Sequence, residues 1–129
     1  MKIIVLSLVA VILCGMSSSA SADGKKLLEY CRAADYYLNE GEFNKEGDHI
    51  KAGFCMGIVE GVGSTMDILS KDEALSNVYR VCFPEDGITG HQAVRVVVKY
   101  LLNHPQDMHH SEVMLVMVAF LDAYPCEYA

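Results

Sequence analysis

Cysteine is the residue type in this chain with the clearest chemistry. Cys31, Cys55, Cys82 and Cys126 are spread along the 129 residues, and no two of them form a Cys-x-x-Cys pair. In an oxidising compartment such thiols pair, so structural disulfides are the first interpretation, ahead of metal ligation or a thiol nucleophile. A fifth cysteine, Cys14, lies in an apolar N-terminal stretch and is expected to be removed with it.

The other reactive side chains do not form a recognisable catalytic set. His104, His109 and His110 lie close together around a proline, but there is no His-Glu-x-x-His pattern. Histidines in such a place are more typical of a solvated turn than of a zinc site. The serines lack a nucleophile elbow, and adjacent acids such as Asp72-Glu73 are typical of exposed turns. The sequence therefore predicts no enzyme, no metal and no cofactor.

The N-terminus has the features of a cleaved secretion signal. Lys2 precedes an apolar stretch from Ile3 to Gly15 that is too short to span a bilayer. Ala20-Ser21-Ala22 then offers small residues to a leader peptidase, so residues 1–22 are expected to be removed by cleavage after Ala22. We therefore expect a single periplasmic domain over residues 23–129, with no membrane contact after cleavage.

The charge balance excludes some classes of partner. The chain has 10 basic and 17 acidic residues and a net charge of −7, and loss of Lys2 with the signal brings the charge near −8. Nucleic acids and anionic lipids attract basic surfaces, so neither is an expected partner. An acidic surface fits simple solubility or a basic protein partner.

Apolar spacing predicts a helical hairpin in the first half of the domain. A helix is predicted over Lys25 to Leu38, followed by an exposed acidic connection over residues 39–48, whose last residue, Asp48, is expected to cap the next helix. That helix carries an apolar stripe from Ile50 to Leu69, with residues recurring at steps of three and four.

Three glycines four residues apart, Gly53, Gly57 and Gly61, run beside this stripe. Each glycine costs a helix about 1 kcal/mol relative to alanine. We expect another part of the fold to pack closely against them, with an intermolecular surface or a helix bend as the alternatives.

Residues 70–82 give weaker signals. A short helical turn is predicted at Lys71 to Ala74, and Val78 to Val81 fits extended or helical structure equally well. Beyond Cys82-Phe83-Pro84, the run Glu85-Asp86-Gly87 predicts a turn.

Two further helices are predicted in the second half. Thr89 and Gln92 form a capping box ahead of the segment Ala93 to His104, which is rich in valine and also fits a strand, although its length and its cap favour a helix. Pro105 ends it. Ser111 then caps a last helix over Val113 to Leu121, which is expected to be buried on most sides.

These helix pairs constrain the disulfides. If the last two helices are antiparallel, the residue before the first lies near the residue after the second, and Cys82 and Cys126 occupy those positions. Cys31 and Cys55 lie at similar distances on either side of the acidic connection. Of three possible pairings we predict Cys31–Cys55 and Cys82–Cys126, in an all-α, disulfide-stapled bundle of four to five helices.

A series of short motifs resembles one family. The motifs are Tyr30-Cys31, the run from Phe54 to Val62 (FCMGIVEGV), Cys82-Phe83-Pro84, the run from Gln92 to Leu101, His104-Pro105 and Tyr124-Pro125-Cys126. Their order is similar to that of the Rap/Tai family of type VI secretion amidase immunity proteins. The resemblance extends from Leu27 to Cys126. It implies a periplasmic, all-α and often homodimeric protein that occupies the active-site cleft of a secreted peptidoglycan amidase, so that the producing cell survives attack by itself or its siblings.

Two regions are candidates for the segment that enters such a cleft. One is an acidic turn ahead of a helix, and the other is a helix face where small residues let a partner approach. An ordinary capped turn and a tight helix contact are the structural alternatives, and we rank the turn first because loops insert more readily than helix faces. The candidate contact residues are Glu85, Asp86, Gly87 and Thr89 in the turn, and Gly61, Ser64 and Asp67 on the helix.

Other small exported binders share this composition. An acid-stress chaperone of the HdeA type would use the 17 carboxylates and five histidines as a pH switch, and would bind clients at low pH. A lysozyme inhibitor or a small-ligand carrier is a further alternative. Selective binding to one amidase near neutral pH would instead indicate the immunity protein.

Overall fold

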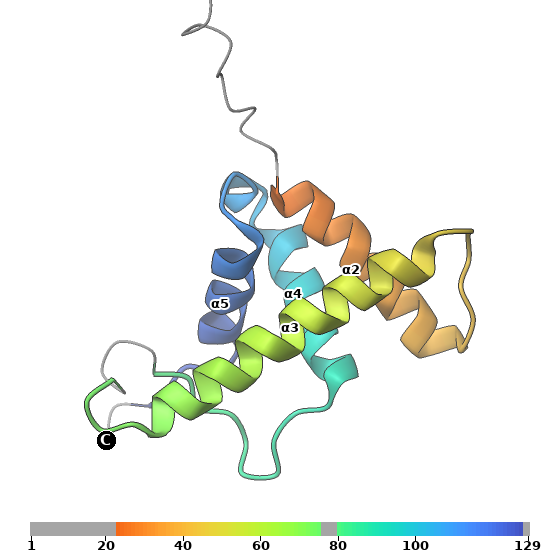
Figure 1. Ribbon diagram of the computed structural model, residues 1–129. Coiled ribbons are helices and arrows are strands. Elements are labelled where there is room, and N and C mark those ends of the chain that lie inside the picture. Colours follow the sequence, from red (N-terminus) through yellow and green to blue (C-terminus); the bar gives the residue numbers. More distant parts are fainter. Residues whose placement is uncertain (1–22, 76–79, 128–129) are drawn as a thin grey trace, which may run out of the picture.

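The computed structural model describes residues 23–75 and 80–127 (Figure 1). Within these ranges it contains four α-helices and a short 3-10 helix, η1. The elements are α2 (Asp23–Glu40), α3 (Asp48–Lys71), α4 (Gly90–Asn103), η1 (Pro105–Asp107) and α5 (Glu112–Ala123). The all-α prediction is confirmed, and the valine-rich segment is a helix, α4. The expected signal peptide, residues 1–22, and Val78 and Tyr79 of the segment Val78 to Val81 lie outside the described residues.

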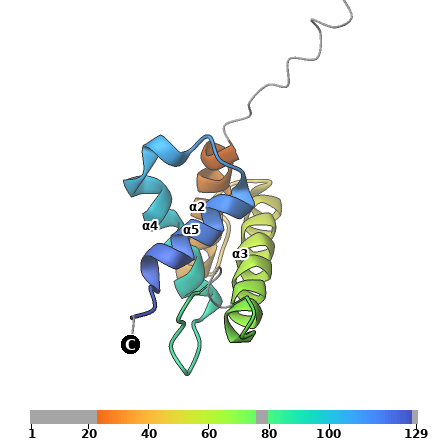
Figure 2. The ribbon, with the colours of Figure 1, turned by 90° about the vertical axis from the view of Figure 1, so that its left-hand side faces the viewer.

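The helices surround one core. α3 crosses the front of the bundle in Figure 1, and the side view in Figure 2 places α3 and α4 on opposite sides with α5 between them. α2 packs mainly on α3, and α5 packs on both α3 and α4. The largest fully buried side chains come from all four helices and include Leu27, Met66, Leu101, Leu115 and Phe120.

The first hairpin is closed by the predicted disulfide. Cys31 and Cys55 are bonded, with their Cα atoms 5.1 Å apart, and both side chains are fully buried. The predicted capping role of Asp48 is wrong. Gly47, at φ +85°, occupies the N-cap position, so Asp48 becomes the first helical residue. Its carboxylate turns back and accepts a hydrogen bond from the backbone N–H of Lys45 at 3.1 Å.

The buried face of α3 is not the predicted stripe. Its fully buried apolar residues are Ala52, Cys55, Val59 and Met66, whereas Ile50 is 68% exposed. The Cys55 disulfide turns this set of positions toward the core. Gly53, Gly57 and Gly61 are exposed, and a Cβ atom added to any of them would meet no described atom within 4 Å. The expected internal packing against these glycines is therefore wrong.

The second helix pair follows the prediction more closely. Cys82 and Cys126 are bonded, with Cα atoms 5.0 Å apart. The capping box of α4 is complete, because the Gln92 N–H donates to Thr89 Oγ1 at 3.2 Å and the Thr89 N–H donates to Gln92 Oε1 at 2.8 Å.

The last helix, α5, is capped by Ser111 as predicted. It is not buried on most sides, however, since Val113 and Met114 are 49% and 46% exposed. Its buried residues, Leu115, Val116, Ala119 and Phe120, occupy one face.

A partly buried tyrosine, Tyr100, holds the connection between α4 and α5 in place. The Tyr100 hydroxyl donates to the Asp107 carboxylate in η1 at 2.7 Å. Burial, followed by this hydrogen bond, raises the pKa of Tyr100 to about 12. The contact fixes η1 against the end of α4, far along the chain from the predicted partner-binding turn.

Candidate functional site

Residues 83–89, ahead of α4, form a turn that protrudes from one end of the bundle (Figures 1 and 2). The Gly87 N–H donates to the carbonyl of Pro84 at 2.8 Å and closes the turn. Gly87 has φ +73°, in the left-handed region that glycine adopts without strain. The sequence Pro-Glu-Asp-Gly therefore dictates a tight reversal with Glu85 and Asp86 at its tip.

Both ends of this turn are anchored. On the α3 side, the Cys82 N–H donates to the Tyr124 carbonyl at 3.0 Å, Val81 forms a bridge with Pro125, and the Cys82–Cys126 disulfide adds a covalent link. On the other side, the capping box of Thr89 fixes the entry into α4. A turn held this way loses little conformational entropy when it meets a partner.

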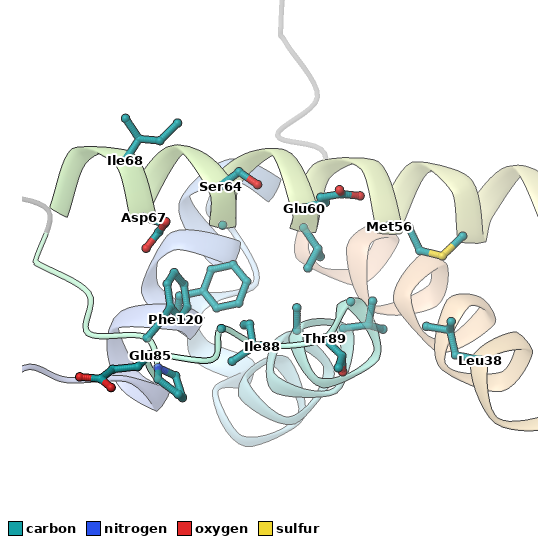
Figure 3. Close-up of a pocket in the computed structure, with 18 of the residues that line it drawn as sticks. Leu38, Met56, Glu60, Ser64, Asp67, Ile68, Glu85, Ile88, Thr89 and Phe120 are labelled. Atoms are coloured by element: carbon teal, nitrogen blue, oxygen red, sulfur yellow. The ribbon is translucent and has the colours of Figure 1, made fainter. Parts of the chain in front are cut away.

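A groove of about 870 Å³ lies between the turn and α3 (Figure 3). The turn side and α4 contribute Phe83, Ile88 and Val94, and α3 contributes Val59. Phe120 of α5 completes the floor. The size and the mostly apolar lining are those of binding sites for small ligands.

Aromatic packing supports the floor of the groove. The Phe83 ring meets the rings of Phe120 and Tyr124 edge to face, with centroids 5.5 and 5.2 Å apart. Phe120 approaches α3 at Gly63, where an added Cβ atom would lie 3.2 Å from the Phe120 ring. Within α3, the glycine that permits a close approach in the fold is thus Gly63, outside the set of three identified from their spacing.

The rim of the groove is acidic. Glu60 and Asp67 line it on α3, and Glu85 lines it on the turn. Asp67 forms an ion pair with Lys71 at 2.6 Å, whereas no ion pair among the described residues involves Glu60 or Glu85. Two uncompensated carboxylates therefore stand on opposite walls of an apolar floor.

The two candidate regions identified in the sequence meet at this groove. Glu85, Gly87 and Thr89 line one wall, while Ser64 and Asp67 line the other. Asp86 and Gly61 are exposed and do not line it. The sequence analysis missed the apolar floor and Glu60. One signal in the sequence could have indicated part of the apolar floor, because Ile88 is a lone apolar residue in an acidic turn.

Metal-binding chemistry has no visible site in the part of the chain that the structure covers. Within residues 23–75 and 80–127, no group of three His, Cys, Asp or Glu side chains is placed to hold an ion. The ring nitrogens Nδ1 of His104 and His109 instead lie 2.9 Å from the carbonyl oxygens of Tyr100 and Gln106.

Comparison with known proteins gives one match. The model of a family described as Rap1a immunity proteins matches residues 23–126, which includes every helix described above and the whole groove. No curated protein and no solved structure matches the chain.

Proposed function

The chain belongs to the Rap1a immunity protein family and is an immunity protein against a secreted effector, and we propose that this effector is a peptidoglycan amidase delivered by a type VI secretion system. In this proposal the protein acts in the periplasm and covers the amidase active site, so that peptide crosslinks of the cell wall cannot enter it. The protein itself performs no chemistry; it excludes the substrate from the partner's catalytic residues.

The observation that carries the proposal is the anchored turn beside the groove. Glu85 and Asp86 form an exposed tip, and Cys82 and Thr89 hold its two ends. A rigid projection with an adjacent concave surface can insert into a cleft and hold its edge at the same time.

Charge supports the choice of partner. The net charge of −7 and the uncompensated Glu60 and Glu85 would speed association with a basic surface through electrostatic steering. This part of the proposal expects the amidase to carry basic residues around its active-site cleft.

The disulfides support the compartment. Cross-links between α2 and α3, and between the turn and the C-terminal segment, form and persist in oxidising surroundings. Export directed by residues 1–22, followed by their removal, would bring the chain to the periplasm, where a cell-wall amidase finds its substrate.

We also propose that two copies associate through the outer face of α3. Ile50 and Ile68 are each 68% exposed, and Phe54 is 39% exposed; Ile68 also lies at the edge of the groove. Among the described helices, α3 is the one that is long and apolar enough to cross a membrane by length and composition alone, yet only 22% of its most apolar window is buried. The disulfide of Cys55 ties α3 into the bundle, so we interpret this face as a protein contact.

The spacing on this face suits a two-fold axis. Ile50 and Ile68 lie at equal distances on either side of Val59, and so do Gly57 and Gly61. In an antiparallel pair of α3 helices, Ile50 of one copy would therefore lie beside Ile68 of the other copy. The glycines of both copies would lie where the two helices cross. Ile68→Lys should convert the dimer to a monomer in sedimentation velocity. Leu102→Lys, at an exposed apolar position on α4, should not.

The function is tested by co-expression in the periplasm. The full chain should rescue cells from lysis by one peptidoglycan amidase, and the same chain without residues 1–22 should not. Glu85→Lys should weaken protection, whereas Glu42→Lys, which changes the net charge equally but lies in the exposed connection after α2, should leave it intact.

Two results would contradict the proposal. One is lysis at the same rate with every amidase tested. The other is equal protection by the form retained in the cytoplasm. Inhibition of lysozyme, or binding of unfolded clients only at acidic pH, would support the lysozyme inhibitor or the acid-stress chaperone instead.

A further inference from the structure

We propose that the groove between α3 and the turn is itself a receptor, which takes an apolar side chain of the partner that is flanked by a basic group. This inference rests on the proposed function, because the partner is the effector. It adds a second direction of insertion: the turn enters the effector's cleft, and a side chain of the effector enters this groove.

The floor of the groove is suited to one large apolar side chain. Val59 and Val94 are almost fully buried beneath it and Phe120 is fully buried, while Ile88 and Phe83 are partly exposed to it. A volume of about 870 Å³ exceeds that of a single side chain, so a phenylalanine or leucine could enter together with the backbone that carries it. An apolar anchor in such a pocket is the usual centre of binding energy in an interface.

The rim selects the charge beside the anchor. Glu60 on α3 and Glu85 on the turn line the groove from opposite walls, and neither has an ion-pair partner among the described residues. The Glu85 carboxylate points outward at the edge of the groove (Figure 3). Asp67 is already bound by Lys71. A lysine or arginine next to the inserted side chain would satisfy one of the two free carboxylates.

The hydrogen bonds of the rim argue for insertion of a side chain rather than addition of a strand. The backbone N–H groups of Gly87 and Thr89 are already bound, to Pro84 O and Gln92 Oε1. The N–H of Gln92 is bound to Thr89 Oγ1. These donors are not available to pair with the backbone of a partner strand.

Charge complementarity also argues against a second copy as the occupant. The chain has 17 acidic residues against 10 basic ones, so a second copy would bring like charge to an acidic rim. Like charges brought together at an interface weaken binding. A partner with a basic surface is favoured.

The test uses small capped dipeptides and the folded chain over residues 23–129 with both disulfides formed. N-acetyl-Phe-Arg-amide is titrated while methyl resonances are followed by NMR, with N-acetyl-Phe-Glu-amide and N-acetyl-Ser-Arg-amide as comparison probes. Phe-Arg should shift the methyl signals of Val59, Ile88 and Val94. Phe-Glu should bind at least about fivefold more weakly, and Ser-Arg should shift none of them.

Blocking variants locate the site. Ser64 on α3 and Gly90 at the start of α4 line opposite walls, both are exposed, and a Cβ atom at Gly90 meets no described atom within 4 Å. Ser64→Trp and Gly90→Trp should each reduce Phe-Arg binding at least about tenfold by filling the groove. Thr65→Trp is the matched control, because Thr65 is exposed on the same helix but does not line the groove.

The preference for a basic group beside the apolar side chain is tested by a matched pair of variants. Glu60→Lys should remove the preference for Phe-Arg over Phe-Glu, and Glu42→Lys, with the same change in net charge, should preserve it. The proposal is overturned if Phe-Arg leaves the groove signals unshifted, or if Phe-Glu binds equally well. Groove signals that shift on concentrating the Ile50→Lys variant, in which the proposed α3 dimer is broken, without any dipeptide would assign the groove to a second copy and would also overturn it.

The two proposals can fail separately. If Ser64→Trp and Thr65→Trp bind the amidase equally and the dipeptides do not bind, the receptor groove is wrong while the immunity function stands. If the dipeptides bind in the groove as expected but no amidase is bound or inhibited, the choice of effector is wrong while the groove stands.

Discussion

The two disulfides hold regions of the molecule that differ in almost every other respect. Cys31–Cys55 lies between α2 and α3 with both side chains fully buried, whereas Cys82 is exposed and Cys126 is partly exposed. The sequence separations are 24 and 44 residues. Chain entropy alone assigns them about 3.5 and about 4 kcal/mol, a small difference. Their surroundings, rather than their loop lengths, therefore separate their roles.

The comparison suggests that the two disulfides have different roles. The buried disulfide fixes the rotation of α3 against α2 and forms part of the core. The exposed disulfide fixes the base of the turn, together with the Cys82 N–H bond to Tyr124. We infer that loss of the first lowers stability alone, whereas loss of the second lowers both stability and affinity for the effector. The predictions below test this difference.

The largest effect is expected from Cys31→Ala with Cys55→Ala. The double variant should lose about 5 kcal/mol of unfolding free energy, because the lost cross-link and the gap left in a fully buried site add together. Urea unfolding measures this loss. The fraction that remains folded should bind the effector as tightly as the unmodified chain. A large drop in the affinity of that fraction would contradict the different roles inferred for the two disulfides.

Cys82→Ala with Cys126→Ala should cost about 3 to 4 kcal/mol of unfolding free energy, since less packing is lost at an exposed site. Its affinity for the effector should fall about tenfold, because the turn must then be ordered on binding. Titration calorimetry gives the affinity. Unchanged affinity would show that the capping box at Thr89 positions the turn by itself.

A further consequence concerns reduction. Because thiolate attack requires access to sulfur, a mild reductant should open Cys82–Cys126 well before Cys31–Cys55. Alkylation followed by mass spectrometry identifies which cysteines have been freed. Simultaneous release of all four would mean that the two regions open together, as one cooperative unit.

Two glycines of α3 extend the comparison to single residues. Gly63→Ala should destabilise the protein by about 1 kcal/mol, since the added Cβ atom lies 3.2 Å from Phe120 in the floor of the groove. Gly53→Ala, near Cys55, should stabilise it by up to about 1 kcal/mol, because the space there is open and alanine favours the helix. Thermal unfolding of both variants shows whether each substitution stabilises or destabilises the protein. A change in the same direction for both would contradict the different packing assigned to Gly63 and Gly53.

The smallest effect is expected at Tyr100, away from both disulfides. Its pKa in the folded protein is raised to about 12 from an ordinary value of 10, so the neutral phenol is favoured by folding. Its contribution is therefore fully present below pH 10 and is lost as the pH rises toward 12. Tyr100→Phe should cost about 1 kcal/mol at neutral pH and remove the highest step in an ultraviolet titration of the tyrosines. If the highest step instead persists in the Tyr100→Phe variant, it belongs to another tyrosine and the raised pKa of Tyr100 is contradicted.

Local signals in the sequence predicted much of the fold. The positions of the cysteines around each helix pair predicted both disulfides. The capping pair Thr89 and Gln92 predicted the start of α4, although the segment is rich in valine. Both predictions succeeded because they depend on residues that are close in sequence or that belong to a single helical hairpin. The rotation of α3 could not be read the same way. Ile50 and Ala52 both fit a helical stripe, and the choice between them depends on contacts with α2 that lie 20 or more residues away.

The candidate site was only half predictable for a similar reason. Glu85, Gly87 and Thr89 have recognisable turn and capping chemistry, and Ser64 and Asp67 were noticed for small size and charge. That these two regions form the walls of one groove depends on the packing of Phe83 and Phe120, which are distant in sequence. Contacts between residues so far apart in sequence produce no periodic pattern along the chain from which they could be predicted.

The central claim is that the effector binds at the end of the molecule that carries the turn and the groove. Hydrogen–deuterium exchange of the full mature chain, with and without the amidase it protects against, tests this most directly. The account predicts slower exchange on binding at residues 60–71 and 83–94, with little change at residues 41–49. Protection concentrated at residues 41–49, or at the start of α5, with the turn unchanged, would contradict it.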